Sequence, residues 1–183
     1  MFQGIKKGAG SLLSLFQSYK LWRVIGKRIF RDISISEASS EDMNTVQMCL
    51  NPGNSPRPTE LNPLVTNLIA TWRGHILGFV QLVRHPPSHA PYVGYWLFSL
   101  TIFHPLCRGL GIGERLCHAI LDHARREGAE EILLIVRQNN RPAVALYQKL
   151  GFSQTSLEGL EEKLIQEAET TGKRRITMVK RFS

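Results

Sequence analysis

Residues 108–113 read Arg-Gly-Leu-Gly-Ile-Gly, and they join two segments of different pattern. The apolar stretch 96–103 precedes them, and a run with helical spacing, carrying Leu116, Ile120 and Ala124, follows. A glycine-rich turn between a strand and a helix presents free backbone N–H groups at the positive end of the helix dipole, where phosphate oxygens bind. The pattern therefore predicts a strand, a phosphate-binding turn and a helix, in that order.

Two common nucleotide motifs do not fit this turn. The dinucleotide motif needs a third glycine, but Glu114 stands at its sixth position when the motif starts at Gly109. The ATP-binding P-loop needs a lysine after its last glycine, and none follows Gly113. What remains is R-x-x-G-x-G before an amphipathic helix, or a turn that serves packing alone.

A second block of sequence bears on which ligand the turn binds. Residues 140–152 read Asn-Arg-Pro-Ala-Val-Ala-Leu-Tyr-Gln-Lys-Leu-Gly-Phe and follow an apolar strand at 132–136. With the glycine-rich turn, this block resembles the two signatures of the GNAT superfamily of N-acetyltransferases, in the family's order and spacing. The resemblance spans roughly residues 33–155. The matching positions of the second signature are Asn140, Ala143, Tyr147, Gly151 and Phe152.

The resemblance implies an α/β (α+β) protein with a single GNAT domain over residues 32–183, containing a mixed sheet of six to seven strands flanked by helices. The local pattern predicts a helix at 41–50 and a strand at 92–103 that is long enough to need a bulge. An extra helix is expected at about 157–169. The other predicted elements are a strand at 33–36, a hairpin of 68–72 and 76–83, and a closing strand at 176–182.

In GNAT enzymes the glycine-rich turn holds the pyrophosphate of acetyl-CoA, so acetyl-CoA is the expected acyl donor. The resemblance makes Tyr147 the general acid, because a phenol keeps its proton at neutral pH and can protonate the departing thiolate. Tyr147 could instead only pack against Phe152, and Asn140 could cap the following helix as well as bind the cofactor. The expected cofactor-binding residues are Thr101, Ile102, Phe103, Arg108, Gly109, Leu110, Gly111, Ile112, Gly113, Asn140 and Tyr147.

The general base is harder to assign. Many GNAT enzymes use a carboxylate on a central strand, but no Asp or Glu occurs between Glu60 and Glu114. Protein N-terminal acetyltransferases often have a glutamate five residues before the motif asparagine, and Ile135 stands there. His104, at the end of the strand before the turn, is a substitute, because the ordinary pKa of histidine suits a base. A chain of waters is the other alternative.

These features favour an acetyl-CoA-dependent N-acetyltransferase that acts on the primary amine of a small molecule, such as an amino sugar. The alternatives are acetylation of a protein N-terminus or lysine, and a non-catalytic acyl-CoA-binding or membrane-associated scaffold. No metal is expected, because Cys49, Cys107 and Cys117 form no ligand pattern. The lack of a disulfide framework indicates a reducing, cytoplasmic location.

Residues 1–31 form a basic arm without an acidic residue, and their apolar and basic positions follow helical spacing. The arm accounts for most of the formal net charge of +8, so the high pI does not indicate nucleic-acid binding. An amphipathic helix of this kind binds an anionic membrane, a second subunit or its own domain, and a transit peptide is a further alternative. Its cations are Lys6, Lys7, Lys20, Arg23, Lys27, Arg28 and Arg31.

Overall fold

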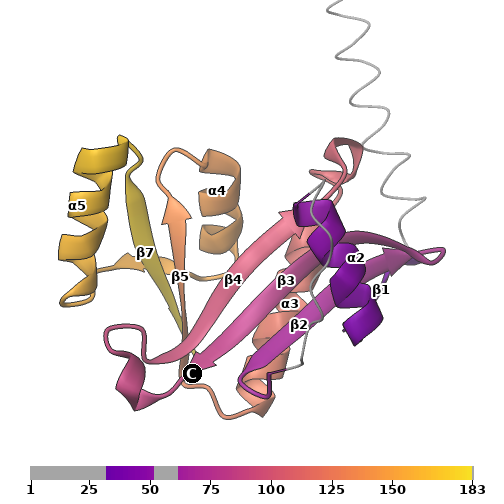
Figure 1. The fold of residues 1–183 in the computed structure, drawn as a ribbon, viewed down its shortest axis with the longest axis horizontal. Helices are drawn as coiled ribbons and strands as arrows, with labels where there is room; N and C mark the ends of the chain where they lie inside the picture. The colour runs from indigo at the N-terminus through magenta and orange to yellow at the C-terminus, as the bar shows by residue number, and fades with distance from the viewer. Residues whose placement is uncertain (1–31, 52–61, 183) are drawn as a thin grey trace, which may run out of the picture.

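The computed structural model describes residues 32–51 and 62–182, so the basic arm lies outside the described residues. This part of the chain contains seven strands and four α-helices (Figure 1). The elements are β1 (Ser34–Glu37), α2 (Ser40–Leu50), β2 (Val65–Trp72), β3 (His75–His85), β4 (Gly94–Ile102), α3 (Ile112–Arg126), β5 (Glu131–Arg137), α4 (Arg141–Lys149), β6 (Ser153–Thr155), α5 (Leu160–Thr171) and β7 (Arg175–Arg181). Short 3₁₀ helices occupy Pro87–His89 and Pro105–Cys107.

The strands form one mixed sheet in the order β1-β2-β3-β4-β5-β7-β6, which confirms the predicted fold class. All neighbours are antiparallel except β4 and β5, which run parallel and pair only at Tyr95–Ile132 and Trp96–Leu133. Both strands continue beyond these pairs, so they separate toward their carboxyl ends. We call this opening, between residues 97–102 and 134–137, the split. Sequence analysis did not predict β6, because three residues are too few to show a period of two.

The predicted bulge is present in β4. The pairing with β3 shifts register between Phe79–Thr101 and Gln81–Phe98, and Ser99 has a positive φ of 52°. One extra residue in β4 reverses which side chains face each side of the sheet. Leu97 and Leu100 therefore both lie against the α3 side of the sheet, although they are three residues apart.

Helices cover both faces of the sheet, and the amphipathic pattern explains which side each helix turns inward. The predicted core residues of α3, Leu116, Ile120 and Ala124, are fully buried in one core with residues of α4. On the opposite face, α2 packs with Met43 and Val46 on the β2–β3 side. The remaining core there contains Trp96, Leu133, Leu160, Leu164 and Val179 and joins α5 to β4, β5 and β7.

Between α2 and α5, the sheet presents a surface that no described helix covers. Asn67, Gln81 and Phe98 stand side by side there, because Asn67 is the cross-strand partner of Gln81 and Gln81 is the partner of Phe98. We call this surface the open face. Phe98 is 37% exposed, which is high for an aromatic side chain in a central strand.

Sequence patterns at the helix ends placed α2 correctly and α5 within a few residues. Ser39 caps α2 and forms a capping box with Asp42. The extra helix extends from Leu160 to Thr171, slightly later than its expected position. Gly172, in a left-handed conformation, ends it before β7 begins.

Candidate active site

The glycine-rich turn forms the start of α3 as predicted. Gly109 and Gly111 have φ angles of 74° and 88°, in the left-handed region that favours glycine. The first bond within the helix runs from the N–H of Arg115 to the Gly111 carbonyl oxygen, at 3.0 Å. The N–H groups of Ile112, Gly113 and Glu114 therefore have no acceptor within the helix, and no side chain caps it.

Gly111 and Gly113, at the start of the helix, differ in their surroundings. A methyl group on Gly111 would have no atom within 4 Å, so its backbone conformation is the constraint. A methyl group on Gly113 would stand 3.9 Å from Leu100 and 3.7 Å from Leu146. Gly113 thus lies between β4 and α4, so the N–H groups of Ile112 and Gly113 are next to the split.

The other residues of the turn hold it in place. Leu110 and Ile112 are buried in the main core, so only their backbone groups are available to a ligand. Arg108 is exposed, and its Nε donates to the carbonyl oxygen of Ile102 at 3.4 Å. This contact keeps a cation between the end of β4 and the turn.

Three of the predicted cofactor-binding residues, Thr101, Ile102 and Phe103, lie at the end of β4 or directly after it. The N–H of Phe103 donates to the Leu77 carbonyl oxygen at 3.1 Å, so this group belongs to the sheet. Thr101 lies opposite Phe79 and two residues before Phe103, so its backbone N–H and carbonyl also point toward β3. The backbone N–H and carbonyl of Ile102 point away from β3. Of the three predicted residues, Ile102 is the one whose backbone N–H and carbonyl point toward the split.

Tyr147 lies in α4 and is 7% exposed, with its ring 5.7 Å from the ring of Phe152 in an edge-to-face arrangement. The expected packing of Tyr147 against Phe152 is therefore present, and its role as the general acid stays a prediction. Burial raises the pKa of Tyr147, and Cys117 in α3 adds to this effect. Burial and the charge of Glu114 raise the pKa of Cys117 to about 12. Both groups are hence protonated at neutral pH.

Two lysines fix the end of the helix that carries Tyr147. Lys149 pairs with Glu114 in the first turn of α3, with 2.7 Å between Nζ and Oε1. Lys180 in β7 donates from Nζ to the Leu150 carbonyl oxygen at 2.7 Å, which satisfies a carbonyl group at the end of α4. Sequence analysis missed both contacts, since each joins residues about thirty or more positions apart.

The structure gives two further predicted site residues local roles. Asn140 is the N-cap of α4, and its Oδ1 accepts from the N–H of Ala143 at 3.4 Å. His104 is exposed, and its Nδ1 accepts from the N–H of Leu106 at 3.2 Å. A neutral imidazole with this bond carries its proton on Nε2, so it has no free lone pair for a substrate proton. The geometry therefore disfavours His104 as the base.

The open face contains a pair of side-chain amides that sequence analysis did not single out. Gln81 donates from Nε2 to Oδ1 of Asn67 at 2.9 Å, and Asn67 is only 8% exposed. Each of these strands carries other polar residues, so the sequence does not mark these two, and only the pairing of β2 with β3 reveals the pair. Strands β2, β3 and β4 carry no carboxylate, and the described part of the chain has no cluster of His, Cys, Asp and Glu suited to a metal ion.

A family comparison agrees with this geometry. The sequence model of the Acetyltransferase (GNAT) family matches residues 35–152. The chain belongs to the GNAT family. Members of this family are acetyltransferases that take the acetyl group from acetyl-CoA. The match covers β1 to α4, including both the glycine-rich turn and the Tyr147 block.

Individual relatives match this GNAT protein over part of its length. A mycothiol acetyltransferase from Corynebacterium glutamicum (strain R) is 35% identical over 89 residues, which are 48% of this chain and 28% of that protein. The chain therefore spans less than a third of the length of this curated relative.

Two solved structures share the GNAT fold over 82–83% of the chain. One, from Bacillus anthracis, is described as a streptothricin acetyltransferase and contains acetyl coenzyme A, with a TM-score of 0.62, 20% identity and 98% of that chain covered. The other is the ribosomal-protein-S18-alanine N-acetyltransferase of Escherichia coli, with a TM-score of 0.60, 21% identity and 94% of that chain covered.

Proposed function

We propose that this GNAT enzyme transfers the acetyl group of acetyl-CoA directly to the primary amine of a small, polar molecule. The observation that carries the proposal is the split. The N–H groups of Ile112 and Gly113, at the start of α3, lie at one side of it, and Tyr147 lies in the helix that follows β5. A phosphate-binding turn suits the pyrophosphate of a CoA thioester, and a protonated phenol suits its leaving thiolate.

In the proposed mechanism, the turn at 109–114 holds the pyrophosphate and the backbone of Ile102 aligns the pantetheine with β4. The neutral amine attacks the thioester carbonyl, and a C–N bond forms as the C–S bond breaks. Tyr147 gives its proton to the departing thiolate, and the amine nitrogen loses one proton to solvent. The products are the acetylated amine and CoA, and Tyr147 regains its proton from water.

The open face supports a polar acceptor rather than a cationic one. The Nε2-to-Oδ1 bond between Gln81 and Asn67 uses one donor and one acceptor of the pair. The remaining amide groups suit hydroxyl or amide groups of a ligand, as in an amino sugar. Relatives named as mycothiol acetyltransferases also support a small-molecule acceptor.

Protein N-terminal acetylation remains the competing function. It is disfavoured because Ile135, at the position of the glutamate often used by such enzymes, packs with the α5 core and cannot act as a base. The similarity to the S18-alanine enzyme is a similarity of fold.

A release assay for free CoA, with acetyl-CoA and a panel of amines, tests the proposal. The panel contains glucosamine, spermidine and a peptide with N-terminal alanine, each with its fully N-acetylated form as a matched blank. We expect CoA release with the amino sugar class and a product heavier by one acetyl group. Turnover of the peptide alone would replace our proposal with protein acetylation. Tight CoA binding without release for any amine would favour a scaffold.

We further propose that residues 1–31 attach the enzyme to an anionic membrane surface. The seven cations support this, since each contributes roughly 1 kcal/mol near such a surface. In the described part of the chain, no helix is long and apolar enough to cross a bilayer. Replacing Arg23, Lys27 and Arg28 by Gln should abolish sedimentation with phosphatidylserine vesicles. Unchanged sedimentation would sink the proposal, and a changed oligomeric state would assign the arm to a second subunit.

A further inference from the structure

Gly78 is a buried glycine in the interior of β3, where it stands between Ala70 of β2 and Ile102 of β4. Its φ is not in the left-handed region, so the backbone conformation does not require a glycine at this position. Glycine in a strand costs stability relative to alanine, because it loses more conformational freedom on folding. A glycine inside a strand often marks a place where another group approaches closely.

The close neighbours of Gly78 are two side chains and one backbone oxygen. A methyl group on this residue would lie 2.7 Å from Cδ1 of Ile102, 2.9 Å from the carbonyl oxygen of Thr101 and 3.2 Å from Cδ1 of Leu116. Carbon atoms in contact normally stand about 3.5–4.0 Å apart, so the methyl group would be too close to all three atoms. The two Cδ1 atoms end flexible side chains, but the Thr101 oxygen belongs to the backbone of β4. A side chain on residue 78 therefore requires β4 itself to move.

The split gives β4 room to move on one side. Strand β3 pairs with one edge of β4 as far as Ile102, whereas β5 pairs with the other edge only at Tyr95 and Trp96. The end of β4 is thus held by β3 and is not held by β5. A displacement away from Gly78 would carry the backbone of Thr101 and Ile102 into the split.

We propose that Gly78 is a positioning residue, which sets the width of the split and hence the fit of acetyl-CoA. Its missing side chain allows the end of β4 to lie close to β3, and it allows Leu116 of α3 to lie close to the sheet. The backbone of Ile102 and the N–H groups of Ile112 and Gly113 are thereby held at a fixed separation. This role rests on the donor contacts proposed above for Ile102 and the turn.

Calorimetric titration of Gly78→Ala with CoA, without any amine, tests this role. The Kd for CoA should rise about tenfold, the loss expected when one hydrogen bond to the ligand is misaligned. Steady-state kinetics should show a similar rise in KM for acetyl-CoA, with KM for the amine unchanged. Wild-type values of Kd and of KM for acetyl-CoA in this variant overturn the proposal. A wild type that binds CoA but acetylates no amine would contradict the proposed function and leave the comparison of Kd values intact.

The double variant Gly78→Ala/Ile102→Val separates movement of the β4 backbone from crowding of side chains. Ile102→Val removes Cδ1, the atom closest to the added methyl group, and leaves the Thr101 carbonyl oxygen in place. We expect Gly78→Ala to weaken CoA binding by the same factor in the Ile102→Val background as in the wild type. No weakening in this background would show that side-chain crowding alone is responsible, which contradicts a displacement of β4. The same background relieves part of the clash, so the comparison is still possible if Gly78→Ala alone does not fold.

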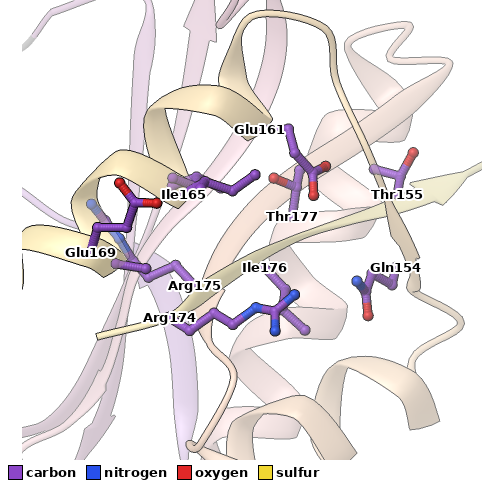
Figure 2. Close-up of a pocket in the computed structure, with 11 residues that line it drawn as sticks. Gln154, Thr155, Glu161, Ile165, Glu169, Arg174, Arg175, Ile176 and Thr177 are labelled. Atoms are coloured by element: carbon purple, nitrogen blue, oxygen red, sulfur yellow. The ribbon is translucent and has the colours of Figure 1, made fainter. Parts of the chain in front are cut away.

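Leu164→Ala is the control for a general loss of stability. Leu164 is 8% exposed and lines a cavity of about 400 Å³ beside α5, where the short strand β6 ends (Figure 2). It belongs to the core on the face of the sheet opposite α3, so its truncation should lower the melting temperature without moving the end of β4. The Kd for CoA should then equal that of the wild type. An equal rise of this Kd in Leu164→Ala and Gly78→Ala would assign Gly78 to packing alone.

Discussion

The donor side of the split and the open face differ in how their residues are distributed along the chain. The donor side is built from two continuous blocks, 108–114 and 140–152, each of which folds locally into a turn and a helix. The open face takes single residues from β2, β3 and β4, which become neighbours only through strand pairing. A block of consecutive residues keeps its local structure when residues elsewhere in the chain are substituted. Each residue of the open face can be substituted independently of the others. This difference explains why the donor is evident and the acceptor is not.

The largest expected effect concerns Tyr147. Tyr147→Phe keeps the ring against Phe152 but removes the proton, so kcat should fall about 100-fold while the melting temperature stays close to that of the wild type. Tyr95→Phe is the matched control, because the Tyr95 hydroxyl donates to the carbonyl oxygen of Glu127, far from the turn. Unchanged kcat in Tyr147→Phe would remove the assigned acid from the donor side.

The pH dependence of kcat adds a second measurement on the same residue. Burial raises the pKa of Tyr147 above its ordinary value near 10, so the phenol stays protonated and competent as the pH rises. Steady-state rates should therefore show no loss of acid catalysis up to about pH 10. A decline with a midpoint near pH 8 would assign proton delivery to another group.

The second prediction compares two helix starts with the same backbone conformation. Gly111 and Gly159 both cap helices in the left-handed region, and a methyl group on either meets no atom within 4 Å. Gly111→Ala and Gly159→Ala should each cost about 1 kcal/mol of stability. Only Gly111→Ala should raise KM for acetyl-CoA, about tenfold, since it disturbs the phosphate-binding turn. If both variants raised this KM equally, the turn would be a packing feature alone.

The third prediction tests the open face. Gln81→Leu removes one amide of the pair and should raise KM for a polar amine about fivefold, the value of one neutral hydrogen bond, with KM for acetyl-CoA unchanged. Gln166→Leu, an exposed position on α5, is the control. If KM for acetyl-CoA changed instead, the open face would contribute to donor binding and would not be a separate acceptor surface.

The smallest effect concerns the ion pair that joins the two donor blocks. Lys149 and Glu114 are both partly exposed, so Lys149→Met should lower the free energy of unfolding by only about 0.5 kcal/mol in chemical denaturation. High salt should produce a similar loss in the wild type and little in the variant. A loss of several kcal/mol would show that the pair is a main link between α3 and α4.

The sequence by itself determined the family, the glycine-rich turn and most element positions, because these features depend on residues close in the chain. The spacing of Leu116, Ile120 and Ala124 reports a helix face directly, and glycine at 111 reports a backbone angle. Only the tertiary structure decided the split, the amide pair of Asn67 and Gln81, and the cavity beside α5. Each depends on where strands begin and stop pairing. Hydrogen bonds between distant backbone segments set these positions, and local side-chain patterns do not encode them.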